Sequence, residues 1–313
     1  MSVVSMRPPL WTGNEAAAAS DAQAIGGTAW NAAGVSIDSR TLQPGDLFVA
    51  LKGETADGHG YVRAAFEKGA AAALVARTDL DAAGGPLLVV DDTLAALVGL
   101  GRVARARCRA RIVAVTGSVG KTSTKEALRH VLAAQGKTHA ATASHNNHIG
   151  VPLTLARLPA DAAFAVCEIG TNHPGEIEPL ARQVRAHVGV ITAIAGVHLE
   201  NFASVEAIAE EKAKIFVAMD DGGAVLPRDS TYYDRLVTGA RAAGVVRHTD
   251  FGQHADAQFR LLDCDLNDTG SAVRALAKGR EVRYRLGAPG RHWVLNSLAV
   301  LAAVDALGGE LDA

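Results

Sequence analysis

The stretch Val113-Ala114-Val115-Thr116-Gly117-Ser118-Val119-Gly120-Lys121-Thr122-Ser123-Thr124 decides the fold of this chain. An apolar run ends in two glycines, which are followed by a lysine, hydroxyl side chains and a helical pattern. Gly117 and Gly120 let the backbone turn its amides inward without Cβ clashes, and such amides can surround a polyphosphate. Lys121 would supply positive charge, and Thr122 would open a helix whose free N–H groups favour anions and whose hydroxyl can bind Mg²⁺. We therefore predict a phosphate-binding loop between a buried strand and a helix.

This loop is shorter than the general phosphate-binding pattern. That pattern has a glycine five residues before the second glycine, and the position is Val115 here, so that only Gly-x-x-Gly-Lys-Thr remains. An ordinary glycine turn with a solvated lysine is the alternative interpretation. It does not explain why a lysine and hydroxyls follow directly on the second glycine.

Composition limits the classes of protein to which the chain can belong. With 313 residues, of which 49% are hydrophobic and 4% aromatic, we expect a soluble α/β protein of two or three domains. A net charge of −2 and the lack of a long basic run argue against a nucleic-acid partner. No apolar run has the length of a membrane span, the start lacks a signal-peptide pattern, and the three cysteines lack metal spacing, so we expect a cytoplasmic location.

The first part of the chain has the pattern of a small α/β domain that ends near Arg109. Strands are predicted at 35–37, 47–51, 72–75 and 87–90, and helices at 61–69 and 93–107. Between the first two strands, Ser39 and Arg40 place a hydroxyl and a guanidinium where they could bind the phosphates of a nucleotide-linked substrate. On spacing alone, an Asx-type turn with a surface arginine is an equally good interpretation.

From Arg111 onward, strand and helix patterns alternate. Strands are predicted at 112–115, 164–169, 188–194 and 224–226, and helices at 125–134, 205–219 and 293–307. Alternation of this kind predicts a mostly parallel sheet with covering helices, to which residues 257–285 add a small antiparallel sheet. The fold class is therefore α/β.

Two ionisable side chains follow strands of the predicted parallel sheet. Ligands bind at the carboxyl ends of such strands, where we place Glu168 and His198 beside the phosphate loop. Glu168 with Thr122 could hold a metal ion, and His198 could bind a second one. The alternatives are a structural histidine and a carboxylate that caps the neighbouring loop.

Two further segments have polar side chains whose role the pattern leaves open. The segment Ser144–Pro152 is predicted to be a loop, in which Asn146 and Asn147 would suit substrate oxygens, although asparagine-rich loops are common. Lys212 lies in a helix with a charged face, for which contact with solvent is the default interpretation.

Together these motifs resemble those of the Mur ligase family, the ATP-dependent amide-forming enzymes of peptidoglycan synthesis. The shortened phosphate loop is the most specific of them. The others are Glu168–Ile177, Asn146-Asn147 with Ile149–Pro152, His198–Phe202, and in the first domain Asp38-Ser39-Arg40, Asp46–Leu51 and Asp57-Gly58-His59. They are most similar to the member of the family that adds D-alanyl-D-alanine.

The resemblance implies an activity and a role for each matching residue. ATP and Mg²⁺ would serve a ligase that joins D-alanyl-D-alanine to UDP-N-acetylmuramoyl-tripeptide through an acyl phosphate. ATP would contact the loop Gly117, Ser118, Val119, Gly120, Lys121, Thr122 and Ser123, with Asn296 at adenine. The metals would be held by Thr122, Glu168, His198 and Lys212, of which the lysine would be carbamoylated. Catalysis would depend on Lys121, Glu168, His198 and Lys212, and substrate would contact Ser39, Arg40, Asn146 and Asn147.

The resemblance also gives a domain plan with two departures. Residues 1–109 would bind the UDP-linked substrate, and residues 110–313 would form the central ATP-binding domain. The family's C-terminal Rossmann-like domain is missing, so we expect the chain to be a fragment, and a monomer. Trp293 stands where the family usually has asparagine. Alternatives are a third-residue-adding Mur ligase, a folylpolyglutamate synthase-like ligase, or a non-catalytic ATP-binding module.

Overall fold

The computed structural model describes residues 9–53, 56–77, 84–141, 144–219 and 222–312, which divide into two compact units. The first unit contains the chain up to Cys108 together with a short return, Pro152–Ala160. The second unit contains Arg109–Val151 and the chain from Asp161 onward. Among the described residues, no helix combines the length and the apolar character that crossing a bilayer requires.

The first unit is built on a five-stranded sheet. Its strand order is β2 (Gln23–Ile25), β7 (Leu87–Val89), β6 (Ala72–Val75), β5 (Asp46–Val49) and β4 (Gly34–Ser36). All neighbouring strands are parallel except the pair β2 and β7, which is antiparallel. The remaining elements are the paired strands β1 (Trp11–Thr12) and β3 (Asn31–Ala32), and the helices α1 (Gly13–Ser20), η1 (Gly58–Tyr61), α2 (Val62–Glu67) and α3 (Thr93–Arg107).

The returning segment is fixed to the first unit by hydrogen bonds to its backbone and side chains. Trp11 is fully buried, and its indole Nε1 donates to the carbonyl oxygen of Ala156 at 2.9 Å. In turn, Nε of Arg157 donates to the carbonyl oxygen of Val35 at 2.6 Å. Because buried indole N–H groups need an acceptor, the return completes the core of this unit.

The second unit is built on one nine-stranded sheet. Its order is β16 (Arg280–Leu286), β15 (Gly270–Ala277), β14 (Phe259–Asn267), β13 (Arg247–Gly252), β12 (Gly223–Pro227), β11 (Val188–Ile191), β8 (Arg111–Thr116), β10 (Phe164–Glu168) and β9 (Thr138–Ala140). From β9 to β14 all neighbours are parallel, and β15 and β16 add an antiparallel edge. Strands β8, β10 and β11 are almost completely buried, which explains their continuous apolar sequences.

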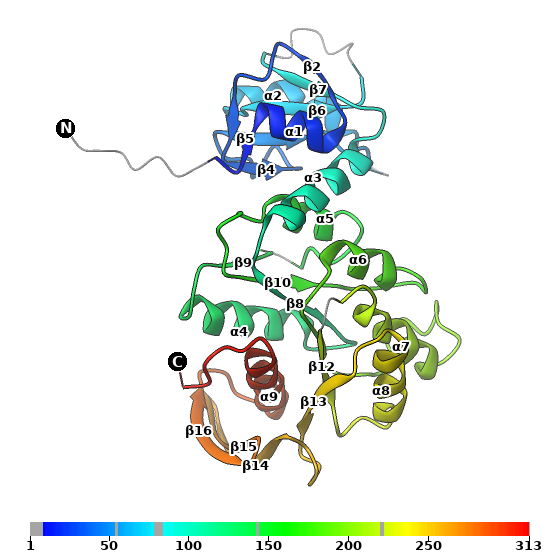
Figure 1. The fold of residues 1–313 in the computed structure, drawn as a ribbon, viewed down its shortest axis with the longest axis vertical. Helices are drawn as coiled ribbons and strands as arrows, with labels where there is room; N and C mark the ends of the chain where they lie inside the picture. The colour runs from blue at the N-terminus through cyan, green and yellow to red at the C-terminus, as the bar shows by residue number, and fades with distance from the viewer. Residues whose placement is uncertain (1–8, 54–55, 78–83, 142–143, 220–221, 313) are drawn as a thin grey trace, which may run out of the picture. The chain divides into compact units, whose positions relative to one another are not determined.

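Helices cover both faces of this sheet. On one face α4 (Lys121–Ala133) lies against α9 (Arg291–Ala306), and on the other α7 (Val205–Ala213) lies against α8 (Tyr233–Ala242) (Figure 1). This unit also contains α6 (Ile177–Val184) and the 3-10 turn η2 (Lys214–Phe216), whereas α5 (Gly150–Ala156) belongs to the first unit from Pro152 onward. Leu128 of α4 and Leu298 of α9 belong to the main core beneath them, together with Val113 of β8.

The structure confirms the α/β class and the mostly parallel central sheet, and it corrects several details. Helix α4 begins at Lys121, four residues before the predicted start. The predicted loop over 144–152 ends in helix α5, because proline is tolerated in a first helical turn, where its missing N–H has no intrahelical acceptor. The predicted antiparallel strands continue the central sheet through β13 and β14 instead of forming a separate sheet.

Replacing Leu128 by alanine tests the packing of α4. Leu128 is fully buried in the core of the second unit, so L128A should lower the free energy of unfolding by about 2–5 kcal/mol. Urea unfolding followed by circular dichroism would measure the change. V246A, at a side chain that is 78% exposed, is the control and should stay within about 0.5 kcal/mol of the unmodified chain.

Candidate functional site

The centre of the site is the loop between β8 and α4. Strand β8 pairs on one side with β10, where Glu168 lies opposite Val115, and on the other side with β11, where Ile191 lies opposite Thr116. All three strands therefore end at the same edge of the sheet. The chain runs to one side of β8 and then to the other, and in such sheets ligands bind at this point of reversal.

The loop depends on its two glycines and on the threonine that follows β11. Gly117 has φ +152°, and a Cβ there would lie 2.0 Å from Oγ1 of Thr192. That hydroxyl donates to the carbonyl oxygen of Val119 at 2.6 Å. Gly120 has φ +85°, and a Cβ there would lie 2.9 Å from the Asn296 amide. No side chain fits at either position, which is consistent with a loop that presents backbone amides.

Ser118 fastens the loop to the segment after β11. Its backbone N–H donates to the carbonyl oxygen of Ala193 at 2.8 Å. Its Oγ donates to the carbonyl oxygen of Ala195 and accepts from the Ala195 N–H, both at 2.9 Å. The loop conformation is thus held by the neighbouring strand as well as by its own sequence.

Lys121 lies over the loop that precedes it. Its Nζ donates to the carbonyl oxygen of Gly117 at 2.8 Å, and burial lowers the pKa of the ammonium while the charge of Glu168 opposes that effect. An ammonium in this position supplies a point charge for phosphate oxygens that bind in the loop.

Glu168 lies at the end of β10 and is only 1% exposed. Thr122 Oγ1 is 3.1 Å from each carboxylate oxygen, and Asn146 Nδ2 donates to Oε1 at 2.8 Å. The ammonium of Lys125, which is fully buried, lies 3.7 Å from Oε2. Thr122 and Glu168, which the sequence predicts to hold a metal ion together, therefore lie within hydrogen-bond distance of each other, and Asn146 bonds to the same carboxylate.

The oxygens of Glu168 and Thr122 are suitable ligands for a magnesium ion that is also bound by phosphate oxygens. Mg²⁺ prefers hard oxygen ligands in octahedral geometry and is commonly held by one or two protein groups together with substrate phosphates. A buried carboxylate with a hydroxyl 3.1 Å away, next to a phosphate loop, provides such a set. Within the described parts of the chain, no group of three or more His, Cys, Asp or Glu side chains is placed to hold a metal alone.

Lys212 is not on a solvated face, which corrects the default interpretation of its helix. The residue is 2% exposed, and burial together with the charge of Lys121 lowers its pKa to about 8, against the opposing effect of Glu211. Glu211 is also buried, and it accepts from the Ile177 N–H at 2.9 Å and from Lys214 Nζ at 2.8 Å. The positive charges of Lys212 and Lys121 therefore repel each other. Because its pKa is about 8, Lys212 is neutral more often than an ordinary lysine at the same pH.

Other predicted residues have no contact with Glu168 or the loop among the interactions of the described residues. The His198 side chain is 43% exposed, with Nδ1 3.6 Å from Glu200, and its φ is +56°. Asn147 Oδ1 accepts from the N–H groups of Ile149 and Gly150, so it caps α5. In the first unit, Arg40 is 87% exposed and paired with Asp38, whose pKa it lowers through its side-chain and backbone hydrogen bonds.

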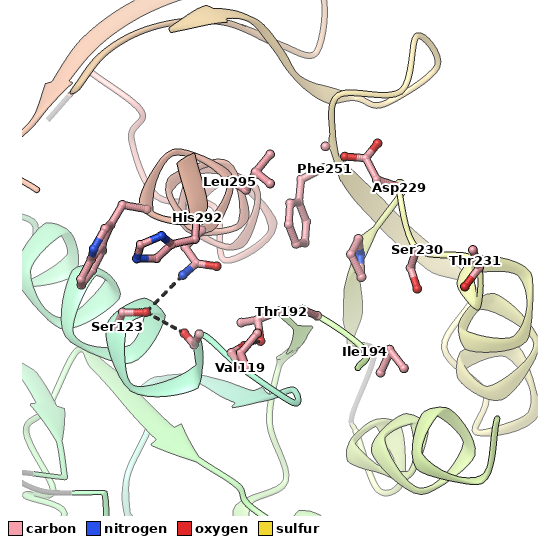
Figure 2. Close-up of a pocket in the computed structure, with 16 residues that line it drawn as sticks. Val119, Ser123, Thr192, Ile194, Asp229, Ser230, Thr231, Phe251, His292 and Leu295 are labelled. Carbon is pink, nitrogen blue, oxygen red and sulfur yellow. Dashed lines mark hydrogen bonds between the residues drawn. The ribbon is translucent and has the colours of Figure 1, made fainter. Parts of the chain in front are cut away.

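A cavity of about 590 Å³ adjoins the phosphate loop. Ser123 and His292 lie on one side of it, and Ser230 and Thr231 on the opposite side (Figure 2). Its apolar walls include Ile194, Phe251, Trp293 and Leu295. An apolar cavity beside a phosphate loop can take the heterocycle of a nucleotide, and its hydroxyl and carboxylate groups can bind a ribose.

Asn296 and Trp293 both line this cavity. Asn296 donates from Nδ2 to Ser123 Oγ at 3.1 Å, so that it supports the loop from α9. The Trp293 ring centroid lies 5.8 Å from that of His292. The side chain that departs from the family pattern therefore faces the space where a base would bind.

Sequence reasoning did not identify Thr192, Asp229 and Lys125. Thr192 and Asp229 follow the ends of β11 and β12, so the rule that selected Glu168 could have selected them as well. Asp229 accepts from the N–H groups of Gln253 and His254 and thereby shapes one wall of the cavity. The sequence pattern places Lys125 at the start of a helix, whereas the helix begins at Lys121 and Lys125 lies within its first two turns.

Comparison with known proteins gives two family matches and several relatives. Residues 115–304 match the Mur ligase middle domain, and residues 31–104 match the catalytic domain of the Mur ligase family. The UDP-N-acetylmuramoyl-tripeptide--D-alanyl-D-alanine ligase of Escherichia coli is 36% identical over 89% of this chain and 61% of that protein. The Bacillus subtilis ligase of the same name is 34% identical over 86% of this chain and 58% of that protein. The chain thus spans about 60% of the length of these relatives.

Solved structures agree with these matches. The UDP-N-acetylmuramoylalanyl-D-glutamyl-2,6-diaminopimelate--D-alanyl-D-alanyl ligase from Acinetobacter baumannii superposes with a TM-score of 0.84 at 30% identity, over 99% of this chain and 68% of that one. MurF ligase from Thermotoga maritima in complex with ADP superposes with a TM-score of 0.73 at 25% identity, over 88% of this chain and 64% of that one. The middle-domain match covers more than half of the sequence, and the chain belongs to the Mur ligase family.

Proposed function

We propose that this chain is the nucleotide-binding and UDP-substrate-binding part of an ATP-dependent ligase that joins D-alanyl-D-alanine to UDP-N-acetylmuramoyl-tripeptide. One observation carries the nucleotide assignment. The buried Glu168 carboxylate lies 3.1 Å from the Thr122 hydroxyl, at the first turn of the helix that follows a glycine loop. The names of the relatives supply the two substrates. We place the reaction in the cytoplasm and expect a monomer.

The nucleotide is bound along the loop and the cavity. The backbone of Gly117–Gly120 surrounds the phosphates, Lys121 contacts the β and γ phosphates, and Ser123 lies where the loop meets the cavity. The base occupies the apolar part of the cavity near Trp293 and Asn296. Thr122 and Glu168 would hold Mg²⁺, which would supply positive charge next to the transferred phosphoryl group.

The chemistry activates a carboxylate that is by itself a poor acyl donor. The terminal carboxylate of the tripeptide attacks the γ phosphorus, the bond to the bridging oxygen of ADP breaks, and an acyl phosphate forms. The amine of D-alanyl-D-alanine then attacks the acyl carbon, loses a proton and displaces inorganic phosphate. Lys121 stabilises the charge that develops on the transferred group, so catalysis consists mainly of positioning and electrostatics.

The neutral Lys212 amine is proposed to form an N–C bond to CO₂ and to release a proton to solvent, which leaves a carbamate that is an anionic metal ligand. A neutral amine forms a carbamate and an ammonium does not, so a pKa of about 8 favours the reaction near neutral pH. Carbamate formation would replace the buried positive charge of Lys212 by a negative charge, which would interact favourably with Lys121. With His198 the carbamate would hold a second Mg²⁺.

The substrate assignment is tested by calorimetric titration with UDP-N-acetylmuramoyl-tripeptide. Arg40 is exposed on the first unit and free to contact the diphosphate, since its contact with Asp38 is also at the surface. R40A should weaken tripeptide binding about tenfold and leave ADP binding unchanged, because the residue belongs to the other unit. R63A is the matched control, since Arg63 is 81% exposed and paired with Glu67 in the same unit.

An equal loss in R40A and R63A would mean that only the general charge of the unit matters. If the folded chain bound ADP but not the UDP-linked tripeptide, the substrate proposal would be wrong for this chain. A generic ATP-dependent ligase or an ATP-binding module would then remain.

A second prediction concerns Lys121. K121M removes the positive charge over the loop, and the affinity for ADP with Mg²⁺ should fall by roughly one to two orders of magnitude. Fluorescence or calorimetric titration would measure it. K278M, at a lysine of the same unit that is 53% exposed and paired with Asp305, should bind ADP as the unmodified chain does.

A third prediction concerns the carbamate. In buffer containing ¹³C-bicarbonate, the unmodified chain should give a carbamate carbon resonance in NMR spectra that is absent in K212M. The resonance should be stronger at pH 8.5 than at pH 6.5, because the pKa of about 8 makes the amine mostly ammonium at the lower pH. A resonance of equal intensity in K212M would assign it to another amine.

A further inference from the structure

Lys125 is a fully buried ammonium in the helix that opens with the phosphate loop. It lies 3.1 Å from Glu126 Oε1, whose side chain is 42% exposed, and 3.7 Å from Oε2 of the buried Glu168. Removing two charges from water is costly, and apolar side chains of similar volume often replace a buried pair without loss of stability. Stability alone therefore gives little reason for a lysine here.

The contacts of Glu168 show what this lysine does to the carboxylate. Asn146 donates to Oε1 at 2.8 Å, and Lys125 faces Oε2. Between them, Thr122 Oγ1 is 3.1 Å from each of the two oxygens. The carboxylate is thus held at both oxygens, with the Thr122 hydroxyl placed symmetrically between them. Rotation about the last side-chain bond of Glu168 would break at least one of these contacts.

Helix geometry makes the arrangement specific. Thr122 and Lys125 are three residues apart, so both project from the same face of α4 toward the end of β10. One helix face therefore supplies the hydroxyl that we assign to the metal and the charge that orients its carboxylate partner.

We propose that Lys125 is a positioning residue that fixes the plane of the Glu168 carboxylate, so that both oxygens face the cation bound at Thr122. The proposal rests on the function proposed above, because it needs a nucleotide-bound Mg²⁺. In this arrangement Lys125 does not contact the nucleotide. Its effect is therefore confined to the part of nucleotide affinity that depends on the metal.

The test is calorimetric titration with ADP, once in Mg²⁺ and once in EDTA, for each variant. K125M keeps the length of the side chain and removes the charge. The ratio of the two affinities should fall about tenfold in K125M, while the affinity in EDTA stays within about twofold of that of the unmodified chain. K125R keeps a cation and should retain a larger ratio than K125M.

The matched control is E126Q, which removes the charge of the other carboxylate beside Lys125 and should leave the ratio unchanged. Thermal unfolding would establish that each variant is folded, and K125Q carries the same expectation if K125M does not fold. An unchanged ratio in the lysine variants, an equal loss with and without Mg²⁺, or an equal effect of E126Q would each overturn the proposal. Lack of ADP binding by the unmodified chain would instead contradict the proposed function.

Discussion

A carboxylate that is 1% exposed needs hydrogen bonds or opposite charge, because an unpaired buried charge is far too costly to keep. Glu168 receives them from the hydroxyl of Thr122, the amide of Asn146 and the ammonium of Lys125. These groups come from α4 and from the segment before α5. The parallel pairing of β8 with β10 brings them together, and the loop, the contacts of Glu168 and the start of α4 all depend on that register.

The loop has a second support on the other side of β8. Thr192 and the backbone of Ala193 and Ala195 bond to the loop from the segment after β11, and Asn296 supports it from α9. A phosphate loop that is held from both neighbouring strands loses little conformational freedom when its ligand binds, so less of the binding free energy is spent on ordering it. The same contacts explain why a Cβ fits at neither glycine.

Local patterns were sufficient to predict part of this structure. A glycine loop between β8 and α4, the strand 72–75 and the helix 93–107 are where the sequence predicts them, because glycine conformation and apolar periodicity are local properties. Glu168 could be found because parallel strands end at one edge. The burial of Lys212 could not, since a charged stretch on a helix is usually solvated and its surroundings come from other elements. The cavity was missed because its walls come from the ends of several strands and from α9.

The first unit is discontinuous in sequence. Trp11 and Val35 each rely on a partner more than a hundred residues later, in the short return Pro152–Ala160. The chain therefore passes between the units three times, and the first unit cannot finish folding until the phosphate loop and α4 have been synthesised. A protein cut after residue 109 would lack the acceptor of the buried Trp11 indole. Any attempt to obtain the first unit alone would have to restore this segment, for instance by circular permutation or by adding it as a peptide.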